Sequence, residues 1–513
     1  MRLVWIGTLS LLSLQGLLGF AVAQKNGGAE VLLSVYDATS SDTFELSLWN
    51  DLLTDESKRL ISPLKIRSVK GADGYIHFTI PAFNSLSYFS IGNTINRSSF
   101  NGEQLYLFNM YPIEPSDRIY IMLKKNTSAD TMPPVYRHPD LETYAMNARY
   151  SFGFGGKGYE KMKCRYEMDS VSSRPLGRGV ILDYGPEKGS FNPNNVYEQQ
   201  MQASLKILSQ YKNHISRSVS DILYADIIGA YQWEKIMQMK VAKDYGDSTF
   251  NRQLIDVYYS KVKPVLKTDV TANAIIKSRF YCSFYIKWKS FESQLDNRTP
   301  EYIYREIKNK FQGTVREKMI TTYVFHDLKR LPEATASNIL QDARQWVNNY
   351  FYRQLLIKVA DLYAAGKPAP VFSLPDVNGA QVNLRDFLGK VVFIDFWYTG
   401  CSNCSAYYGY QLSKVEHHFK DDKRVVFLTI SVDGDRDKWL KSVNSGLYTS
   451  KNAINLYTNG QTMQHHVIKD YMVEGYPRPV LIDKKGNMFS SSAKDLRKAE
   501  TLQETISKAL AQN

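Results

Sequence analysis

The chain has 513 residues, of which 64 are Lys or Arg and 51 are Asp or Glu, so its formal net charge is +13. A chain of this length exceeds what one hydrophobic core usually serves, and we expect roughly two or three domains. The basic residues are spread along the sequence without a dense run, which favours a solvated basic surface and argues against a nucleic-acid partner. The 4 cysteines are too few for a scaffold built on disulfides.

Residues 1–23 predict a signal peptide. Arg2 precedes an apolar run rich in Leu and Gly, and residues 21–23 read Ala-Val-Ala, the small-x-small pattern that signal peptidase recognises. Cleavage there leaves Gln24 first, which is not the Cys of a lipid anchor. No later stretch reaches the ~20 apolar residues of a membrane span. We therefore expect a soluble protein, exported to the periplasm or cell envelope.

Residues 24–365 fall into three stretches that differ in composition and in the spacing of their apolar residues. Residues 24–131 predict a β-rich, sandwich-like domain, because short runs alternate apolar and polar residues, as in Ile-His-Phe-Thr-Ile at 76–80. Residues 132–194 are rich in Pro, Gly and Asn and predict an irregular connecting region. Residues 195–365 carry apolar residues at helical spacing, and Thr-Pro-Glu at 299–301 is typical of a helix start, so we expect a central α-helical domain.

Residues 153–158 match the letters of a dinucleotide-binding fingerprint, G-x-G-x-x-G. The neighbouring sequence lacks the βαβ pattern of such a site and has no well-placed acidic residue about twenty positions on. Lys157 is also not followed by the Ser or Thr of a phosphate-binding loop. We interpret this segment as a glycine-rich structural turn.

Residues 366–513 alternate strands with helices around a Cys-x-x-Cys pair, Cys401 and Cys404, which is typical of an α/β thioredoxin fold. The predicted elements are a hairpin within 370–390, a buried strand at 391–397, a helix to about 420, a strand at 425–432, a helix from about 436, a helix around 462–471, a hairpin at 480–489 and a closing helix from about 493.

The spacing of Cys401 and Cys404 favours redox cycling. Two thiols three positions apart at a helix start can close a small disulfide ring. The helix dipole and the free backbone N–H groups stabilise a thiolate at that end, so we expect Cys401 to be the nucleophile. Cys404, one turn along, is then the thiol that resolves the mixed disulfide.

From about residue 367 onward the sequence resembles the thioredoxin-like thiol-disulfide oxidoreductases of the TlpA/ResA type, in the redoxin group. Its most specific pieces are Gly389-Lys390, Asp-Phe-Trp at 395–397, the Cys pair, and Gly-Tyr-Pro-Arg-Pro at 475–479. The upstream regions resemble, more loosely, the N-terminal extension of large multi-domain members. The resemblance implies exchange of disulfides with protein dithiol or disulfide substrates, a membrane-linked thiol electron donor, and no cofactor or metal.

The resemblance also implies roles for residues around the Cys pair. Asp395 corresponds to a buried carboxylate that accepts the proton of Cys404, with a local hydrogen-bonding role as the alternative. Pro477 matches the cis-proline that faces the Cys pair and leaves the preceding backbone free to pair with a peptide. Tyr476 then lines the substrate groove, and Trp397 either shields the thiols beside the substrate or belongs to the core.

The chain departs from the family pattern at several positions near the pair. Gly400 stands where many relatives carry Trp, Ser402-Asn403 replaces the common Gly-Pro, and Gly409 stands where thioredoxins kink the helix with Pro. Residues between the cysteines influence the redox potential. We expect a reductase, with oxidation and isomerisation of disulfides as open alternatives.

The residues fit other functions less well. A zinc site would need two more ligands near the pair, and His417 and His418 point about 100° apart on a helix. A peroxiredoxin-like peroxidase lacks its Pro-x-x-x-Thr-x-x-Cys motif here. The alternative from another class is a partner- or glycan-binding envelope protein with a vestigial thioredoxin-like domain, against which the retained Cys pair argues. We interpret Cys164 and Cys282 as buried structural thiols, with a disulfide between them as the alternative.

Overall fold

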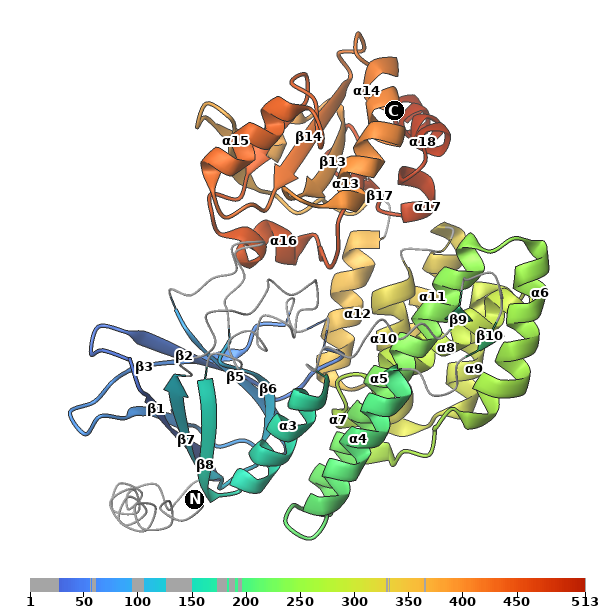
Figure 1. The fold of residues 1–513 in the computed structure, drawn as a ribbon. Helices are drawn as coiled ribbons and strands as arrows, with labels where there is room; N and C mark the ends of the chain where they lie inside the picture. Colours follow the sequence, from blue (N-terminus) through green and yellow to red (C-terminus); the bar gives the residue numbers. More distant parts are fainter. Residues whose placement is uncertain are drawn as a thin grey trace.

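The computed structural model places the C-terminal part of the chain (orange and red) above a blue β-rich part and a green to yellow helical part (Figure 1). The predicted signal peptide at 1–23 lies outside the described residues. No helix within those residues is both long and apolar enough to cross a membrane. The structure describes residues 27–94 except 56 and 58–60, 106–125, 150–172, 182–183, 190–191, 196–328, 331, 333–363 and 366–512.

The β-rich part contains two four-stranded sheets, ordered β4-β1-β7-β8 and β3-β2-β5-β6. Both sheets contribute to one hydrophobic cluster, since alternate residues point inward; in β4, Ile76, Phe78 and Ile80 are buried while His77 and Thr79 are exposed. The strands are β1 (Ala29–Val35), β2 (Thr43–Trp49), β3 (Leu64–Val69), β4 (Ile76–Ile80), β5 (Ser87–Asn93), β6 (Phe108–Ile113), β7 (Arg118–Lys125) and β8 (Tyr150–Lys157).

The irregular region expected at 132–194 is regular over 150–172, so the prediction is wrong for those residues. Strand β8 pairs antiparallel with β7 along its whole length, and α3 (Tyr159–Ser172) follows directly and packs against the first helix of the helical part. The strand could not be recognised from the sequence because its glycines have low strand propensity. It forms because its backbone hydrogen-bonds to the edge of β7. The same region also holds the short antiparallel pair β9 (Leu182–Asp183) and β10 (Ser190–Phe191).

The glycine-rich segment at 153–158, expected to be a structural turn, is mostly strand: residues 153–157 belong to β8, and only Gly158 lies in the turn before α3. Gly156 has φ +89°, and a Cβ there would lie 2.1 Å from the Arg118 carbonyl oxygen. Gly158 has φ +88°, and a Cβ there would lie 2.1 Å from Asp117 Oδ1 and 2.9 Å from Lys161 Nζ. Only glycine, which has no Cβ, allows these two segments of the chain to approach so closely.

The helical part is joined to the β-rich part through a buried ion pair. Arg279 is 0% exposed, and its Nε donates to Asp55 Oδ1 at 2.8 Å. Its backbone N–H donates to Asp226 Oδ1 at 2.7 Å. The elements are α4 (Val196–Tyr211), α5 (Arg217–Tyr245), α6 (Ser248–Val257), the π turn η3 (Tyr258–Val262), η4 (Lys263–Val265), α7 (Ala272–Lys277), α8 (Tyr281–Leu295), α9 (Pro300–Lys310), α10 (Gly313–Asp327), α11 (Glu333–Trp346) and α12 (Tyr350–Tyr363).

The C-terminal part has a five-stranded sheet ordered β15-β14-β13-β16-β17, in which β13, β14 and β15 are parallel. The short β15, with the polar Asn455 inside it, is the one strand here that the sequence did not predict. The elements are β11 (Ser373–Pro375), β12 (Gln381–Asn383), η6 (Leu384–Phe387), β13 (Val391–Trp397), α13 (Ser402–Tyr407), η7 (Tyr408–Leu412), α14 (Ser413–His418), β14 (Val425–Ser431), α15 (Arg436–Ser445), β15 (Ile454–Tyr457), η8 (Thr462–Gln464), α16 (His466–Asp470), β16 (Arg478–Ile482), β17 (Met488–Ser490), α17 (Ala493–Leu496) and α18 (Ala499–Ala511).

The two faces of β13 pack against different helices. Val391 and Phe393 share a cluster with residues of α13, α14 and α18, whereas Val392 and Ile394 share one with residues of α16 and the β11–β12 hairpin. Because side chains alternate along a strand, Asp395 lies on the face of Phe393. The fold therefore directs this carboxyl towards the helices that follow the Cys pair.

Replacing Gly158 with Ala is expected to lower the free energy of unfolding by about 2 to 4 kcal/mol, because the new Cβ strains the backbone and disturbs the ion pair of Asp117 with buried Lys161. The matched control is Gly74→Ala, where φ is +86° but nothing lies within 4 Å, so only about 1 kcal/mol should be lost. Urea unfolding of the full chain measures both. Equal losses at the two sites would contradict the steric explanation.

Candidate active site

Cys401 and Cys404 form a disulfide with a Cα–Cα distance of 5.2 Å, at the start of α13. Cys401 is the N-cap residue, and its Sγ accepts a hydrogen bond from the Cys404 backbone N–H at 3.1 Å. Its carbonyl oxygen accepts the Ser405 N–H at 3.1 Å. The Cys404 N–H, at the start of the helix, also donates to the Cys401 carbonyl oxygen at 3.1 Å, so this donor is shared between the carbonyl oxygen and the sulfur.

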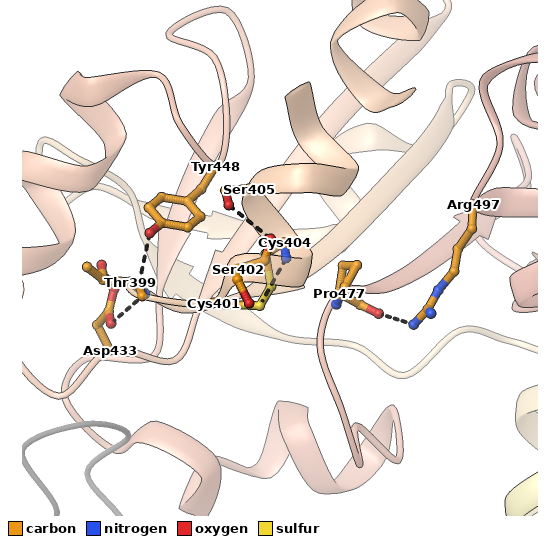
Figure 2. The surroundings of a disulfide bond; sticks show 10 residues. Thr399, Cys401, Ser402, Cys404, Ser405, Asp433, Tyr448, Pro477 and Arg497 are labelled. Carbon is orange, nitrogen blue, oxygen red and sulfur yellow. Dashed lines mark hydrogen bonds between the residues drawn. A yellow bond between two sulfur atoms is a disulfide. The ribbon is translucent and has the colours of Figure 1, made fainter. Parts of the chain in front are cut away.

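The residues before Cys401 are held from two other loops. The backbone N–H of Thr399 donates to Asp433 Oδ1 at 3.0 Å, and its hydroxyl donates to Asp433 Oδ2 at 2.8 Å. The Gly400 N–H donates to the Tyr448 hydroxyl at 3.0 Å. Figure 2 shows these residues on one side of the disulfide and Pro477 on the other.

Gly400 has a structural reason to be glycine. Its φ is +98°, a conformation that residues with a side chain rarely adopt. A Trp at this position, as in many relatives, is therefore disfavoured by this backbone. Asp433 and Tyr448 were not identified from the sequence, because they lie far along the chain and belong to no motif; the departure at Gly400 was the one local signal.

Trp397 is part of the core beneath the site. Its side chain is 0% exposed, and its ring stacks on Tyr448 with centroids 5.0 Å apart and an interplanar angle of 9°. It shares a hydrophobic cluster with Cys401 and Cys404, which are 5% and 1% exposed. The expected substrate contact of Trp397 is thus corrected: the ring packs behind the thiols, and burial prevents it from touching a partner.

Asp395 is a buried carboxyl, 1% exposed, and burial raises its pKa to about 8. The positive charge of Arg497 opposes this rise, as do backbone hydrogen bonds. Its Oδ1 has no hydrogen-bond partner among the described residues. Burial also raises the pKa of Tyr407, and the charge of Asp395 adds to that effect. Since Tyr407 lies three residues after Cys404, Asp395 lies close to the helix that carries the second cysteine.

The Tyr476–Pro477 peptide bond is cis, as the resemblance implied. Arg497, in the short connection between α17 and α18, donates from Nη2 to the Pro477 carbonyl oxygen at 2.6 Å (Figure 2). The Tyr476 ring meets Tyr398 edge-on, with centroids 5.2 Å apart. Arg497 is thus a further residue of the site, and no sequence pattern indicated it. Its guanidinium contacts the Pro477 carbonyl oxygen, and its positive charge opposes the rise in the pKa of the buried Asp395 carboxyl.

Gly409 lies in η7, a π-helical turn that interrupts the helix between α13 and α14. The sequence predicted one helix to about residue 420, and the chain follows that course with a local distortion. Such a turn alters helix direction without a proline. The helix is therefore irregular at Gly409 although it lacks the Pro that thioredoxins carry there.

Cys164 and Cys282 are free and buried, so the interpretation as structural thiols is confirmed over a disulfide between them. Burial raises the pKa of Cys164 to about 12 and also raises that of Cys282. Neither thiol therefore ionises near neutral pH. Across the described residues, no three His, Cys, Asp or Glu side chains are grouped so that they could hold a metal ion.

A mixed sheet with a Cys pair at the start of the helix after its central strand, a buried carboxyl in that strand and a cis-proline beside the pair define a thioredoxin-like domain. The family model described as thioredoxin-like matches residues 389–488. Thiol-disulfide oxidoreductase ResA of Bacillus thuringiensis is 31% identical over 143 residues, which cover 28% of this chain and 77% of that protein. This chain therefore belongs to the ResA family of thioredoxin-like thiol-disulfide oxidoreductases.

Other proteins are similar to part of the chain. Thioredoxin-like protein YneN of Bacillus subtilis is 27% identical over 121 residues, covering 24% of this chain and 66% of YneN. Among solved structures, the thioredoxin domain of a thiol-disulfide oxidoreductase from Bacteroides vulgatus is 30% identical, with a TM-score of 0.25, and the match covers 28% of this chain and 96% of that one.

Asp395 should make stability depend on pH. Its pKa is about 8 in the folded chain against an ordinary 3.8, so the folded state holds the proton more tightly. This contribution is full below about pH 4 and is lost as pH rises towards about 8. We expect the free energy of unfolding of the oxidised wild type to fall relative to Asp395→Asn by about 1 kcal/mol per pH unit across this range. Urea unfolding at several pH values measures the difference, and a pH-independent difference would contradict the assignment.

Proposed function

We propose that this protein is an exported thiol-disulfide oxidoreductase that reduces disulfides of protein partners through Cys401 and Cys404. The observation that carries the proposal is the disulfide at the N-terminus of α13, with the Cys404 N–H directed at Cys401 Sγ at 3.1 Å. That hydrogen bond favours the thiolate, which is the attacking species and the better leaving group. A disulfide that only braces the fold would not require it.

In the reductive direction, the Cys401 thiolate attacks one sulfur of the partner disulfide. The partner S–S bond breaks, its second sulfur leaves as a thiolate, and Cys401 becomes part of a mixed disulfide. Cys404 then attacks Cys401 Sγ and releases the partner as a dithiol. Two electrons pass to the partner, and the Cys401–Cys404 disulfide is the oxidised product.

We assign to Asp395 the proton released by Cys404 during the second step. The pKa of Asp395, about 8, lies close to the ordinary thiol pKa of about 8.5, and a base matched to its acid transfers protons efficiently. The strand parity that directs Asp395 towards α13 supports this role. Tyr476 and Pro477 are the proposed substrate-binding residues, because the Tyr476–Pro477 bond is cis and the resemblance implies that such a proline faces the pair.

The broader setting is also proposed. Residues 1–23 direct export to the periplasm or cell envelope, where a membrane-linked thiol donor returns electrons to the pair. We divide the chain into a β sandwich at 24–131, a connecting region at 132–194, a helical domain at 195–365 and the thioredoxin-like domain at 366–513, with β8 and α3 regular inside the connecting region. The separate sheets of the β-rich and thioredoxin-like parts support this division, although one hydrophobic cluster contains residues of both the β-rich and the helical parts.

Full-length protein supplied with dithiothreitol should reduce insulin, and Cys401→Ser should abolish turnover. Cys404→Ser should instead accumulate mixed disulfides on Cys401, detected as dithiothreitol-sensitive adducts on non-reducing gels. Cys164→Ala is the matched control, because it removes a buried thiol that the mechanism does not use, and it should remain active. Equal inactivity of wild type and Cys401→Ser on all disulfides would favour a binding protein with a vestigial domain.

Asp395→Asn should slow the second step about 100-fold and leave the first unchanged, because only Cys404 passes a proton to this carboxyl. Reaction of the reduced protein with the aromatic disulfide DTNB separates the steps: attack by Cys401 releases one thiolate, and resolution by Cys404 releases the second. Stopped-flow absorbance measures both phases. Equal slowing of both phases would indicate the local hydrogen-bonding role instead.

A further inference from the structure

The loop that carries Pro477 is anchored outside its own domain. We call residues 472–477, between α16 and β16, the proline loop. Met472 has φ +47° and is 7% exposed, and its side chain belongs to the hydrophobic cluster of the helical part. Neighbouring Val473, by contrast, packs in the core of the thioredoxin-like part. The loop therefore starts with a side chain inserted among the helices.

Glu474 makes the next contact with the helical part. Its Oε1 lies 3.6 Å from Nδ1 of His326, at the end of α10, and the two side chains are only 11% and 12% exposed. The other imidazole nitrogen, Nε2, lies 3.0 Å from the hydroxyl of Thr54 in the β-rich part. A single imidazole thus touches all three parts of the molecule.

The far side of His326 is firmly held. Thr54 is buried, and its backbone N–H donates to the Ser57 hydroxyl at 3.0 Å. The next residue, Asp55, donates its N–H to the Arg279 carbonyl at 3.0 Å and pairs with the buried Arg279 guanidinium. His326 therefore lies between Thr54, which these contacts hold in place, and Glu474.

The distance from this anchor to the active site is short. Only Gly475 and Tyr476 separate Glu474 from Pro477, so the connection spans at most about 10 Å. A Cβ at Gly475 would have nothing within 4 Å, so no neighbour packs against this residue on that side. The position of Glu474 therefore contributes, together with the Arg497 contact and the Tyr398 ring, to where Tyr476 and Pro477 lie relative to the disulfide.

We propose that His326 is a positioning residue for thiol-disulfide exchange: through Glu474 it sets the proline loop against the Cys pair and so determines the fit of protein substrates. This inference rests on the proposed function. The thiols themselves are held separately, by contacts of Thr399 and Gly400 inside the thioredoxin-like part. Loss of the anchor should therefore impair recognition of a folded or peptide partner and spare the reaction with a small disulfide.

The test compares two substrates of the full-length protein, insulin and DTNB. In His326→Leu we expect kcat/KM for insulin to fall about 10-fold through a higher KM, the usual effect of losing one buried polar contact. The DTNB rates and the redox potential of the pair should not change. His77→Leu is the matched control, because His77 contacts Asp73 at 2.7 Å in the β-rich part, and it should behave as wild type on both substrates.

Two conservative variants identify the contact that matters. Asn at position 326 places an amide nitrogen near the Nδ1 position, towards Glu474, whereas Gln reaches the Nε2 position, towards Thr54. His326→Asn should recover most of the insulin activity and His326→Gln should not. If His326→Leu does not fold, Glu474→Gln, which keeps the size of the side chain and removes its charge, should show the same split between substrates.

Hydrogen exchange provides a second readout. In the oxidised protein, peptides covering the proline loop should exchange faster in His326→Leu, while those covering α13 keep their protection. Insulin and DTNB rates that fall together, or that both stay at the wild-type value, would overturn the proposal. A wild type that reduces neither substrate would instead refute the proposed function.

Discussion

The hydrogen bond from the Cys404 backbone N–H to Cys401 Sγ is the interaction on which the proposed chemistry depends, because it directs a donor at the positive end of a helix towards a sulfur atom. It forms only if the turn between β13 and α13 has one shape. Asp433 and Tyr448 hold that turn from neighbouring loops by accepting hydrogen bonds from Thr399 and Gly400, and buried β13 fixes where it begins. The rest of the thioredoxin-like fold holds this turn, and with it the Cys404 N–H and Cys401 Sγ, in place.

Burial of Asp395 is the second constraint. A carboxyl on the face of β13 that packs against helices would be replaced by an apolar residue if stability alone mattered, as it is at Val391 and Phe393 on the same face. Arg497 lessens the penalty, since its charge favours the ionised form. The site thus retains a group that is costly to bury at the position where the proposed mechanism moves a proton, in keeping with the pattern of functional residues in other proteins.

The sequence predicted the elements that repeat a simple pattern, and missed those that depend on distant partners. Apolar runs predicted β13 and β14, and the Cys-x-x-Cys spacing indicated the Cys pair. The resemblance supplied Asp395 and Pro477. Strand β15 escaped because it is short and polar, and β8 because glycine has low strand propensity. Arg497 and His326 were missed since they reach the site from remote segments, and burial of Trp397 could be recognised only from packing.

The pairing of Gly400 with Tyr448 constrains how this site can evolve. The resemblance implies a Trp directly before the first cysteine in many relatives, whereas here an aromatic ring comes from a loop 48 residues along the chain and bonds to the glycine backbone. Restoring Trp at position 400 alone would conflict with φ +98°. The two positions must therefore change together, and motif searches that require the aromatic in sequence would overlook proteins that supply it through space.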